Sequence, residues 1–209
     1  IVDELAVIDI DVTTKDKSID FNLIKNLASE CRMPMSYGGG VKNIEQIEKI
    51  ISLGVEKVLI SSEVIANPEL IREAVERVGS QSVVVVLDIK KHPIFKKYSI
   101  YTHNGKIKSE IKITDMLNRI IDLGAGEIVV NSINNDGLMK GFELSLIEQI
   151  DNLQIPIILS GGCGSPEHIE KALKSNISGV AAGSIFYYSQ FSYDDIKKYL
   201  REKKINIRF

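Results

Sequence analysis

Apolar runs rich in valine and isoleucine alternate with amphipathic stretches along almost the whole chain. The runs are apolar at consecutive positions, which is typical of strands buried on both faces of a parallel sheet. We predict strands over Leu5–Ile10, Met33–Tyr37, Lys57–Ser61, Ser82–Asp88, Glu127–Asn131, Ile155–Ser160 and Gly179–Ala182. Apolar residues recur at helical spacing over Phe21–Cys31, Ile44–Leu53, Pro68–Val78, Thr114–Leu123, Leu144–Asp151, Pro166–Ser175 and Tyr193–Lys203. The alternation predicts an α/β fold with a parallel sheet.

Local signals refine these elements. Asn43 and Ser165 are expected to cap the helices that follow them, and Pro166 suits a first helical position. Between the fourth strand and its helix, Tyr98–Ile107 alternates around Asn104-Gly105, which predicts a short hairpin. Before this hairpin, the lysine pairs Lys90-Lys91 and Lys96-Lys97 flank a short segment. They indicate either a solvated loop or a loop that closes over a ligand.

The chain also repeats itself. Pro34–Ser62 aligns with Pro156–Ser184 without a gap, at an offset of 122 residues and with nine of 29 pairs identical. Each copy reads as a strand, a glycine pair, an amphipathic helix, a second strand and a serine. Glycine N–H groups and serine hydroxyls at strand ends can hold an anion. The repeat therefore predicts two equivalent anion sites and a ligand with two phosphates.

Strand–helix units at this spacing predict a (β/α)8 TIM barrel built from two duplicated half-barrels, with residues 1–209 as one domain. Four units begin at or after Ser82, but only three precede it. We therefore expect the first strand and helix of the barrel to be missing ahead of Ile1.

Composition narrows the class of protein. A hydrophobic content of 44% in 209 residues is enough for one substantial core. The net charge of −2 gives no basic excess for nucleic acid or membrane surfaces. No apolar run approaches the ~18 residues of a membrane span, and we expect no signal peptide. Neither the histidines nor Cys31 and Cys163 have metal-ligand spacing. We expect a cytoplasmic protein with reduced thiols, no metal and no cofactor.

In such barrels the ligand lies at the carboxyl ends of the strands, so polar residues at strand ends are the candidate site. They are Asp9, Asp11, Gly38–Gly40, Ser61, Ser62, Asp88, Asn131, Asn134, Asp136, Gly137, Gly161, Gly162, Gly183 and Ser184. Asp88 ends an apolar strand, where a carboxyl can act as general acid or base or simply cap a loop. The glycines suit anion binding, but ordinary turns also require glycine.

Five segments resemble the cyclase subunit of imidazole glycerol phosphate synthase, the barrel known as HisF. They are VVVVLDIK (83–90), GAGEIVVNSINNDG (124–137), GLMKGFEL (137–144), ILSGGCG (158–164) and AAGSIF (181–186). The resemblance keeps order and spacing along the chain. It implies a lyase of histidine biosynthesis that takes ammonia from a glutaminase. With it, the enzyme converts the bis-phosphorylated ribonucleotide PRFAR into imidazole glycerol phosphate and AICAR.

The resemblance also implies roles for single residues. Asp88 matches the second of two catalytic aspartates; the first would lie in the missing strand, so we expect this chain to be inactive alone. The first phosphate would bind Gly40, Ser61 and Ser62, although the family often has Asn-Thr in place of the two serines. The second would bind Gly137, Gly162, Gly183 and Ser184. Asp9, Asn131 and Asp136 would contact substrate hydroxyls or the carboxamide, whereas Asp11 is as well explained as a loop residue.

A second constellation lies at strand starts, where Glu4, Lys57 and Glu127 place charges that need partners if they point inward. Solvated charges are the plain alternative. The resemblance implies an ammonia gate there, with a further arginine in the missing strand. It also implies a separate HisH-like glutaminase docked on that N-terminal face.

Three other functions stay open. SECRMPMSYGGG, YTHNG and DGLMKGF are similar to HisF-like proteins that supply ammonia for sugar amidation in surface-polysaccharide (O-antigen) biosynthesis. A non-catalytic barrel that only scaffolds a glutaminase is another alternative. The isomerase of the same pathway shares the phosphate sites, but GAGEI and the hairpin fit the cyclase better. An aspartate at the end of the missing strand would favour the cyclase over ammonia delivery.

Overall fold

The computed structural model describes residues 2–15, 17–150 and 153–208. Seven parallel strands form one curved sheet in the order β1-β2-β3-β4-β7-β8-β9. They are β1 (Leu5–Ile8), β2 (Met35–Gly38), β3 (Lys57–Ile60), β4 (Val83–Lys91), β7 (Glu127–Ser132), β8 (Ile157–Ser160) and β9 (Gly179–Ala181). The predicted hairpin is confirmed, since β5 (Tyr98–Thr102) pairs antiparallel with both β4 and β6 (Ile107–Lys108). All seven predicted strands are present, and the α/β class is confirmed.

Six of the predicted helices are confirmed, namely α2 (Phe21–Glu30), α3 (Ile44–Ser52), α5 (Glu69–Val78), α6 (Ile113–Asp122), α8 (Pro166–Leu173) and α10 (Tyr193–Glu202). Helix α7 (Leu144–Ile147) is shorter than predicted, and the predicted end at Asp151 lies outside the described residues. Asn43 caps α3, accepting a hydrogen bond from the N–H of Gln46 at 3.0 Å. Ser165 holds the N-cap position of α8, but its hydroxyl makes no capping hydrogen bond.

Three short helices were not predicted: α1 (Ile10–Thr14), α4 (Ser62–Ala66) and α9 (Ser184–Tyr188). Each follows directly on the end of a strand. The prediction that β1 runs to Ile10 is wrong, because Asp9 begins α1 by accepting hydrogen bonds from the backbone of Asp11 and Val12. Likewise Ser82 ends a single 3-10 turn, η1 (Ser80–Ser82), before β4 begins.

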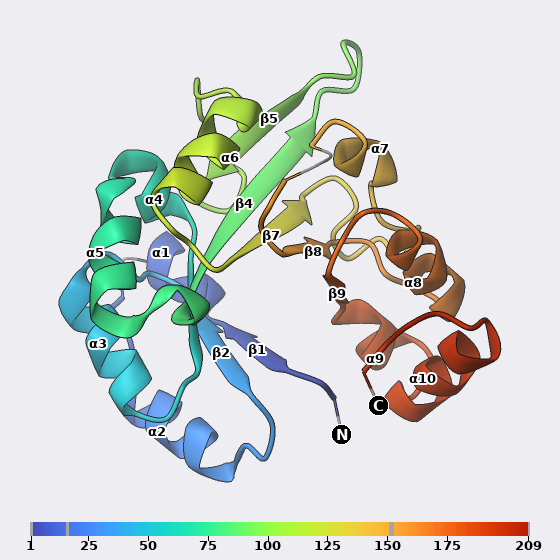
Figure 1. Cartoon of the computed structure of the whole chain (residues 1–209), viewed down its shortest axis with the longest axis horizontal. Helices are drawn as coiled ribbons and strands as arrows, with labels where there is room; N and C mark the ends of the chain where they lie inside the picture. Colours follow the sequence, from blue (N-terminus) through green and yellow to red (C-terminus); the bar gives the residue numbers. More distant parts are fainter. Residues whose placement is uncertain (1, 16, 151–152, 209) are drawn as a thin grey trace.

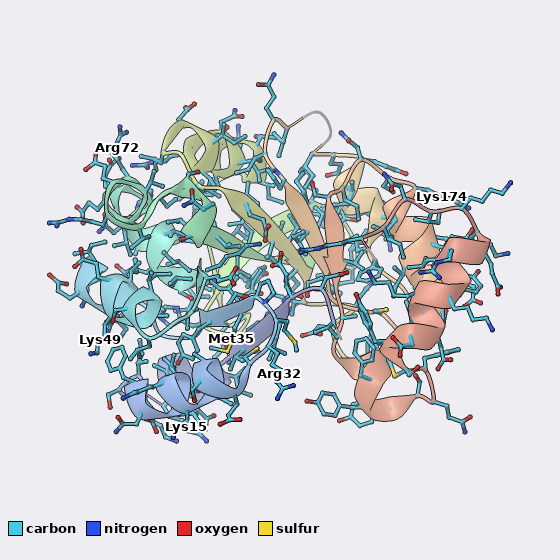
Figure 2. The ribbon with its side chains drawn as sticks, turned by 60° about the horizontal axis from the view of Figure 1, so that its bottom comes forward. Lys15, Arg32, Met35, Lys49, Arg72 and Lys174 are labelled. Carbon is cyan, nitrogen blue, oxygen red and sulfur yellow. The ribbon has the colours of Figure 1, made fainter. Side chains whose placement is uncertain are left out.

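The helices cover the outer face of the curved sheet (Figure 1). β4 lies in the middle of the strand order and is buried on both sides over its first half, with Val83, Val84 and Val85 at 0% exposure. Charged side chains such as Lys49, Arg72 and Lys174 project from the outer surface, whereas Met35 at the start of β2 is buried (Figure 2). The packing of the core between the sheet and the helices therefore fixes the positions of the carboxyl ends of the strands.

The internal repeat is also present in the positions of the strands. β1 and β7 begin at Leu5 and Glu127, β2 and β8 at Met35 and Ile157, and β3 and β9 at Lys57 and Gly179, an offset of 122 residues each time. Among the described strands, β4 has no counterpart at this offset. Because β4 lies between β3 and β7, the counterpart of its place is the opening between β9 and β1 (Figure 1).

β1 and β9 are the two ends of the sheet. An ion pair joins the two sides of this opening near the starts of the strands, between Lys197 Nζ of α10 and Asp3 Oδ2 at 2.9 Å. The two termini of the chain accordingly lie near one another in Figure 1. The sheet is thus a curled barrel wall with one opening.

Candidate active site

Asp88 lies at the carboxyl end of β4, next to Asn131 on β7. The two residues are register partners in the parallel ladder, and Asn131 Nδ2 donates to Asp88 Oδ1 at 2.8 Å. Burial raises the pKa of Asp88, and the nearby charge of Asp136 adds to this, while hydrogen bonds from Asn131 and Ser61 act against it. Because the net shift is upward, the carboxyl holds its proton to a higher pH than a solvated aspartate. Such a group is suited to proton transfer.

The first glycine–serine cluster is built from the ends of β2 and β3. Gly39 has φ 121°, and a Cβ there would lie 2.3 Å from the carbonyl oxygen of Asp9. Gly40 follows with φ 66°. Ser61 lies near enough to Asp88 to lower its pKa, which brings this cluster close to the end of β4. The structure therefore brings the predicted first anion site beside the candidate catalytic carboxyl.

The second cluster lies at the ends of β8 and β9. A Cβ on Gly162, which has φ 105°, would lie 2.2 Å from the carbonyl oxygen of Gly141, so close backbone packing alone requires glycine there. Gly183 and Gly137 differ, because a Cβ at either position would meet nothing within 4 Å. Turn geometry thus explains Gly162, while Gly183, directly before Ser184, faces open space that a ligand can reach.

Asp9 and Asp136 lie at the ends of β1 and β7, as predicted, but the carboxylate of Asp9 is already used. Its Oδ1 accepts the N–H groups of Asp11 at 3.0 Å and of Val12 at 3.3 Å, which starts α1. Asp9 also lines a pocket of about 850 Å³ formed by residues between Asp9 and Leu23. Asp11 instead lies in the first turn of α1 and pairs with Lys15 at 2.7 Å on the surface, so it is a surface residue of a helix and not of a loop.

Glu4, Lys57 and Glu127 meet at the opposite end of the strands. Lys57 Nζ lies 2.8 Å from Glu4 Oε2 and 3.2 Å from Glu127 Oε2. The Lys57 side chain is 20% exposed. Burial disfavours the charge of Lys57, but the hydrogen bonds and charges of the two carboxylates outweigh it and raise the pKa of the ammonium group. The three predicted charges therefore form one cluster and are not separately solvated.

The hairpin contributes contacts at the strand ends that the sequence did not indicate. The N–H of His103, at the tip between β5 and β6, donates to Ser62 Oγ at 3.1 Å. Asn104 Nδ2 lies 3.4 Å from the carbonyl oxygen of Ile10 in α1. In the sequence, only the Asn104-Gly105 turn indicates the tip of the hairpin, and it does not predict which residues the tip contacts.

Lys91, Glu143 and Ser145 are also joined, at the outer side of the same strand ends. Lys91 Nζ lies 3.1 Å from Glu143 Oε1 and 3.1 Å from Ser145 Oγ. Lys91, the last residue of β4, is thus bound to Glu143, the residue before α7, and to Ser145 within α7. No three histidine, cysteine, aspartate or glutamate side chains gather as a metal site would need within the described part of the chain.

The parallel curved sheet, with helices on its outer face and polar residues at the carboxyl ends of its strands, places the chain in the class of (β/α) barrels. Comparison with known proteins agrees. A family model described as "Histidine biosynthesis protein" matches residues 1–192. The imidazole glycerol phosphate synthase subunit HisF of Petrotoga mobilis is 38% identical over 208 residues, which are 99% of this chain and 82% of that protein.

Two further relatives carry the same subunit name. HisF of Thermococcus onnurineus is 37% identical over 208 residues, 99% of this chain and 82% of that protein. A Leptospira borgpetersenii protein provisionally named as the same subunit is 46% identical over 188 residues, 89% of this chain and 74% of that protein. The chain therefore belongs to the histidine biosynthesis protein family, as a HisF-type cyclase subunit. About a fifth of the length of the two HisF relatives lies outside the match.

No helix among the described residues is long and apolar enough to cross a membrane.

Proposed function

We propose that the chain is the cyclase subunit of imidazole glycerol phosphate synthase and acts on PRFAR at the carboxyl ends of its strands. The observation that carries this proposal is the position of Asp88, whose carboxyl has a raised pKa and lies directly beside one glycine–serine cluster. The repeat places a second cluster at the ends of β8 and β9, so one bis-phosphorylated ligand would span the site. Gly40, Ser61 and Ser62 would hold one phosphate, and Gly137, Gly162, Gly183 and Ser184 the other.

In this site Asp88 would accept and return protons while the imidazole ring closes. Its raised pKa brings the carboxyl closer to the pH at which both steps are effective. Asn131, which donates to Asp88, would keep that carboxyl oriented toward the ligand. Asp9 and Asp136 would contact hydroxyl or carboxamide groups between the two phosphates.

The binding part of this proposal is tested by calorimetric titration of PRFAR into the 209-residue chain and into Gly183→Asp. A Cβ at Gly183 meets nothing within 4 Å, so the aspartate fits but repels a phosphate. We expect binding to the unchanged chain and at least about tenfold weaker binding to the variant. Ser29→Asp, at an exposed position on α2, is the matched control for added charge. Failure of the unchanged chain to bind PRFAR would instead support the glutaminase scaffold.

The Lys57 cluster supports ammonia entry at the other end of the strands, with a HisH-like glutaminase docked on that face. Lys57 bridges Glu4 and Glu127 across the barrel bottom, so its displacement would open a path between them. We expect Lys57→Met, assayed with a glutaminase partner in a protein that also carries the proposed first strand, to lower the ratio of glutamine-dependent to ammonium-dependent turnover. An unchanged ratio would speak against the gate. Ammonia delivery for sugar amidation shares this gate, and an apolar residue in place of an aspartate at the end of the proposed first strand would favour it.

The opening between β9 and β1 supports one more element, a parallel strand equivalent to β4 followed by a helix. The register of this strand follows if the partners of β4 are replaced by the residues that correspond to them at the offset of 122. The first residue of the strand would then lie opposite Val180, the second opposite Leu5 and the sixth opposite Asp9. The sixth residue corresponds to Asp88. An aspartate there would supply the second catalytic carboxyl that the resemblance implies.

A polypeptide of residues 81–123 of this chain, which carries β4, Asp88 and α6, is the probe for that place. Added to the 209-residue chain, it should slow hydrogen exchange at the amides of Leu5–Ile8. The same polypeptide with Val85→Pro loses a ladder donor and should protect them far less. Equal protection by both polypeptides, or none by either, would refute the register.

A further inference from the structure

Lys91, the last residue of β4, is hydrogen-bonded to both ends of one loop. Its main chain pairs with the side chain of Asn134, because Lys91 N donates to Asn134 Oδ1 at 2.6 Å and Asn134 Nδ2 donates to Lys91 O at 3.4 Å. The N–H of Ile133 donates to the carbonyl of Ile89 at 2.9 Å just before this contact. These hydrogen bonds hold the start of the loop after β7 against the end of β4.

The side chain of Lys91 binds the other end of the same loop. Its ammonium group donates to Glu143 Oε1 and to Ser145 Oγ, both at 3.1 Å, and lies 5.1 Å from the ring centroid of Tyr98. The hydroxyls of Tyr98 and Ser145 are 2.6 Å apart, and Ser145 also hydrogen-bonds Glu143. The Lys91 and Glu143 side chains are 28% and 16% exposed, so this ion pair is partly shielded from solvent.

Between these anchors, the loop of residues 134–143 lies directly on the second glycine cluster. Gly141 N donates to Gly162 O at 2.8 Å, and Asn135 Nδ2 donates to Gly141 O at 2.9 Å. A Cβ on Gly164 would lie 2.3 Å from the carbonyl oxygen of Met139, which shows how closely the two backbones approach. The loop also carries Asp136 and Gly137. Its placement therefore sets the shape of one half of the ligand site.

We infer that Lys91, Glu143, Ser145 and Tyr98 form a positioning clamp that fixes the loop of residues 134–143 against the second glycine cluster, and so sets the affinity of that half of the site for phosphate. The phosphate part rests on the proposed function, whereas the loop part does not. The clamp residues act through the loop and need not touch the ligand. Lys91 holds one end of the loop through its main chain and the other through its ammonium group. Hydrogen bonds to charged groups are stronger than neutral ones, which favours a fixed position of the loop.

The loop part is tested by hydrogen exchange on the unligated 209-residue chain. In Lys91→Met, we expect the protected amides of the loop, among them that of Gly141, to exchange about tenfold faster, since the Glu143 anchor is lost while the main-chain pairing with Asn134 remains. Lys91→Arg keeps the cation and should restore most of the protection. Lys90→Met is the matched control. Lys90 precedes Lys91 in the same strand, but its ammonium group lies over the ring of Tyr101. Loop exchange in Lys91→Met equal to that in Lys90→Met would overturn the clamp.

The ligand part is tested by titrating inorganic phosphate into the same variants. The expected result is weaker phosphate binding by Lys91→Met and Glu143→Gln, with Lys90→Met and Lys91→Arg close to the unchanged chain. Faster loop exchange with unaltered phosphate affinity would refute the effect on binding. If the unchanged chain binds no phosphate at all, the proposed function fails, and the exchange experiment still decides the clamp.

Discussion

Asp88 combines a partly buried carboxyl with only a few hydrogen-bond donors, and this has a measurable effect on the free energy of unfolding. Its pKa is raised in the folded protein above the value of 3.8 for a solvated aspartate, first because of burial. The folded state therefore binds this proton more tightly than the unfolded state does. The contribution of Asp88 to stability is greatest at low pH and is lost as pH rises from 3.8 through the raised value.

Asp88→Asn should consequently be more stable than the unchanged chain at pH 7, because the amide is never charged. The difference in the free energy of unfolding should shrink as pH falls toward 3.8, where the unchanged carboxyl regains its proton. Urea unfolding of both proteins across this pH range measures it. A difference that does not depend on pH would show that Asp88 ionises in the folded state as it does in the unfolded chain.

The two cysteines should differ in reactivity. Both are free, but Cys163 is buried, and burial raises the pKa of its thiol to about 11, with partial relief from a hydrogen bond to the backbone of Ser165. Cys31 is partly exposed. At pH 8 a thiol reagent should react quickly with one equivalent and with the second only upon unfolding. In Cys31→Ser the fast phase should disappear; its persistence would mean that Cys163 is accessible.

At the scale of elements, the sequence predicts what extends over several residues. Strands such as Val83–Lys91 and helices such as Ile113–Asp122 have long enough patterns to be found. Helices α1, α4 and α9 have five residues each, too few for apolar positions to recur over several turns, and α1 begins with the capping by Asp9. The same limit holds for the site. Its residues follow from strand ends, but contacts such as Ser62 with His103 depend on where a loop folds back.

The loops after β8 and β9 offer a direct comparison of two glycines. Gly162→Ala should destabilise the protein by about 1–3 kcal/mol, because Gly162 has φ 105° and its new Cβ would lie 2.2 Å from a carbonyl oxygen. Gly183→Ala should change stability by less than about 0.5 kcal/mol, since nothing lies within 4 Å. Urea unfolding distinguishes them. Similar losses in both variants would mean that Gly183 is also structural.

At the scale of the whole molecule, the repeat predicted the architecture more fully than any single motif. The strand starts of the two halves differ by the same 122 residues as the aligned sequences do. The repeat could not predict features that lie outside the aligned segments. The hairpin on β4 and the clamp around Lys91 lie outside both Pro34–Ser62 and Pro156–Ser184.

Among the described residues β1 and β9 are the two edges of the sheet, and this gives self-association of the 209-residue chain a direction. Unpaired strand edges bind other edges readily. Because β1 and β9 are different surfaces, a molecule that docks β1 onto the β9 of its neighbour leaves one edge of each kind still free. Such head-to-tail contacts close into rings or extend into open polymers. Light scattering should therefore give a mass that rises above that of the monomer as the concentration increases, and a constant monomer mass would speak against this association.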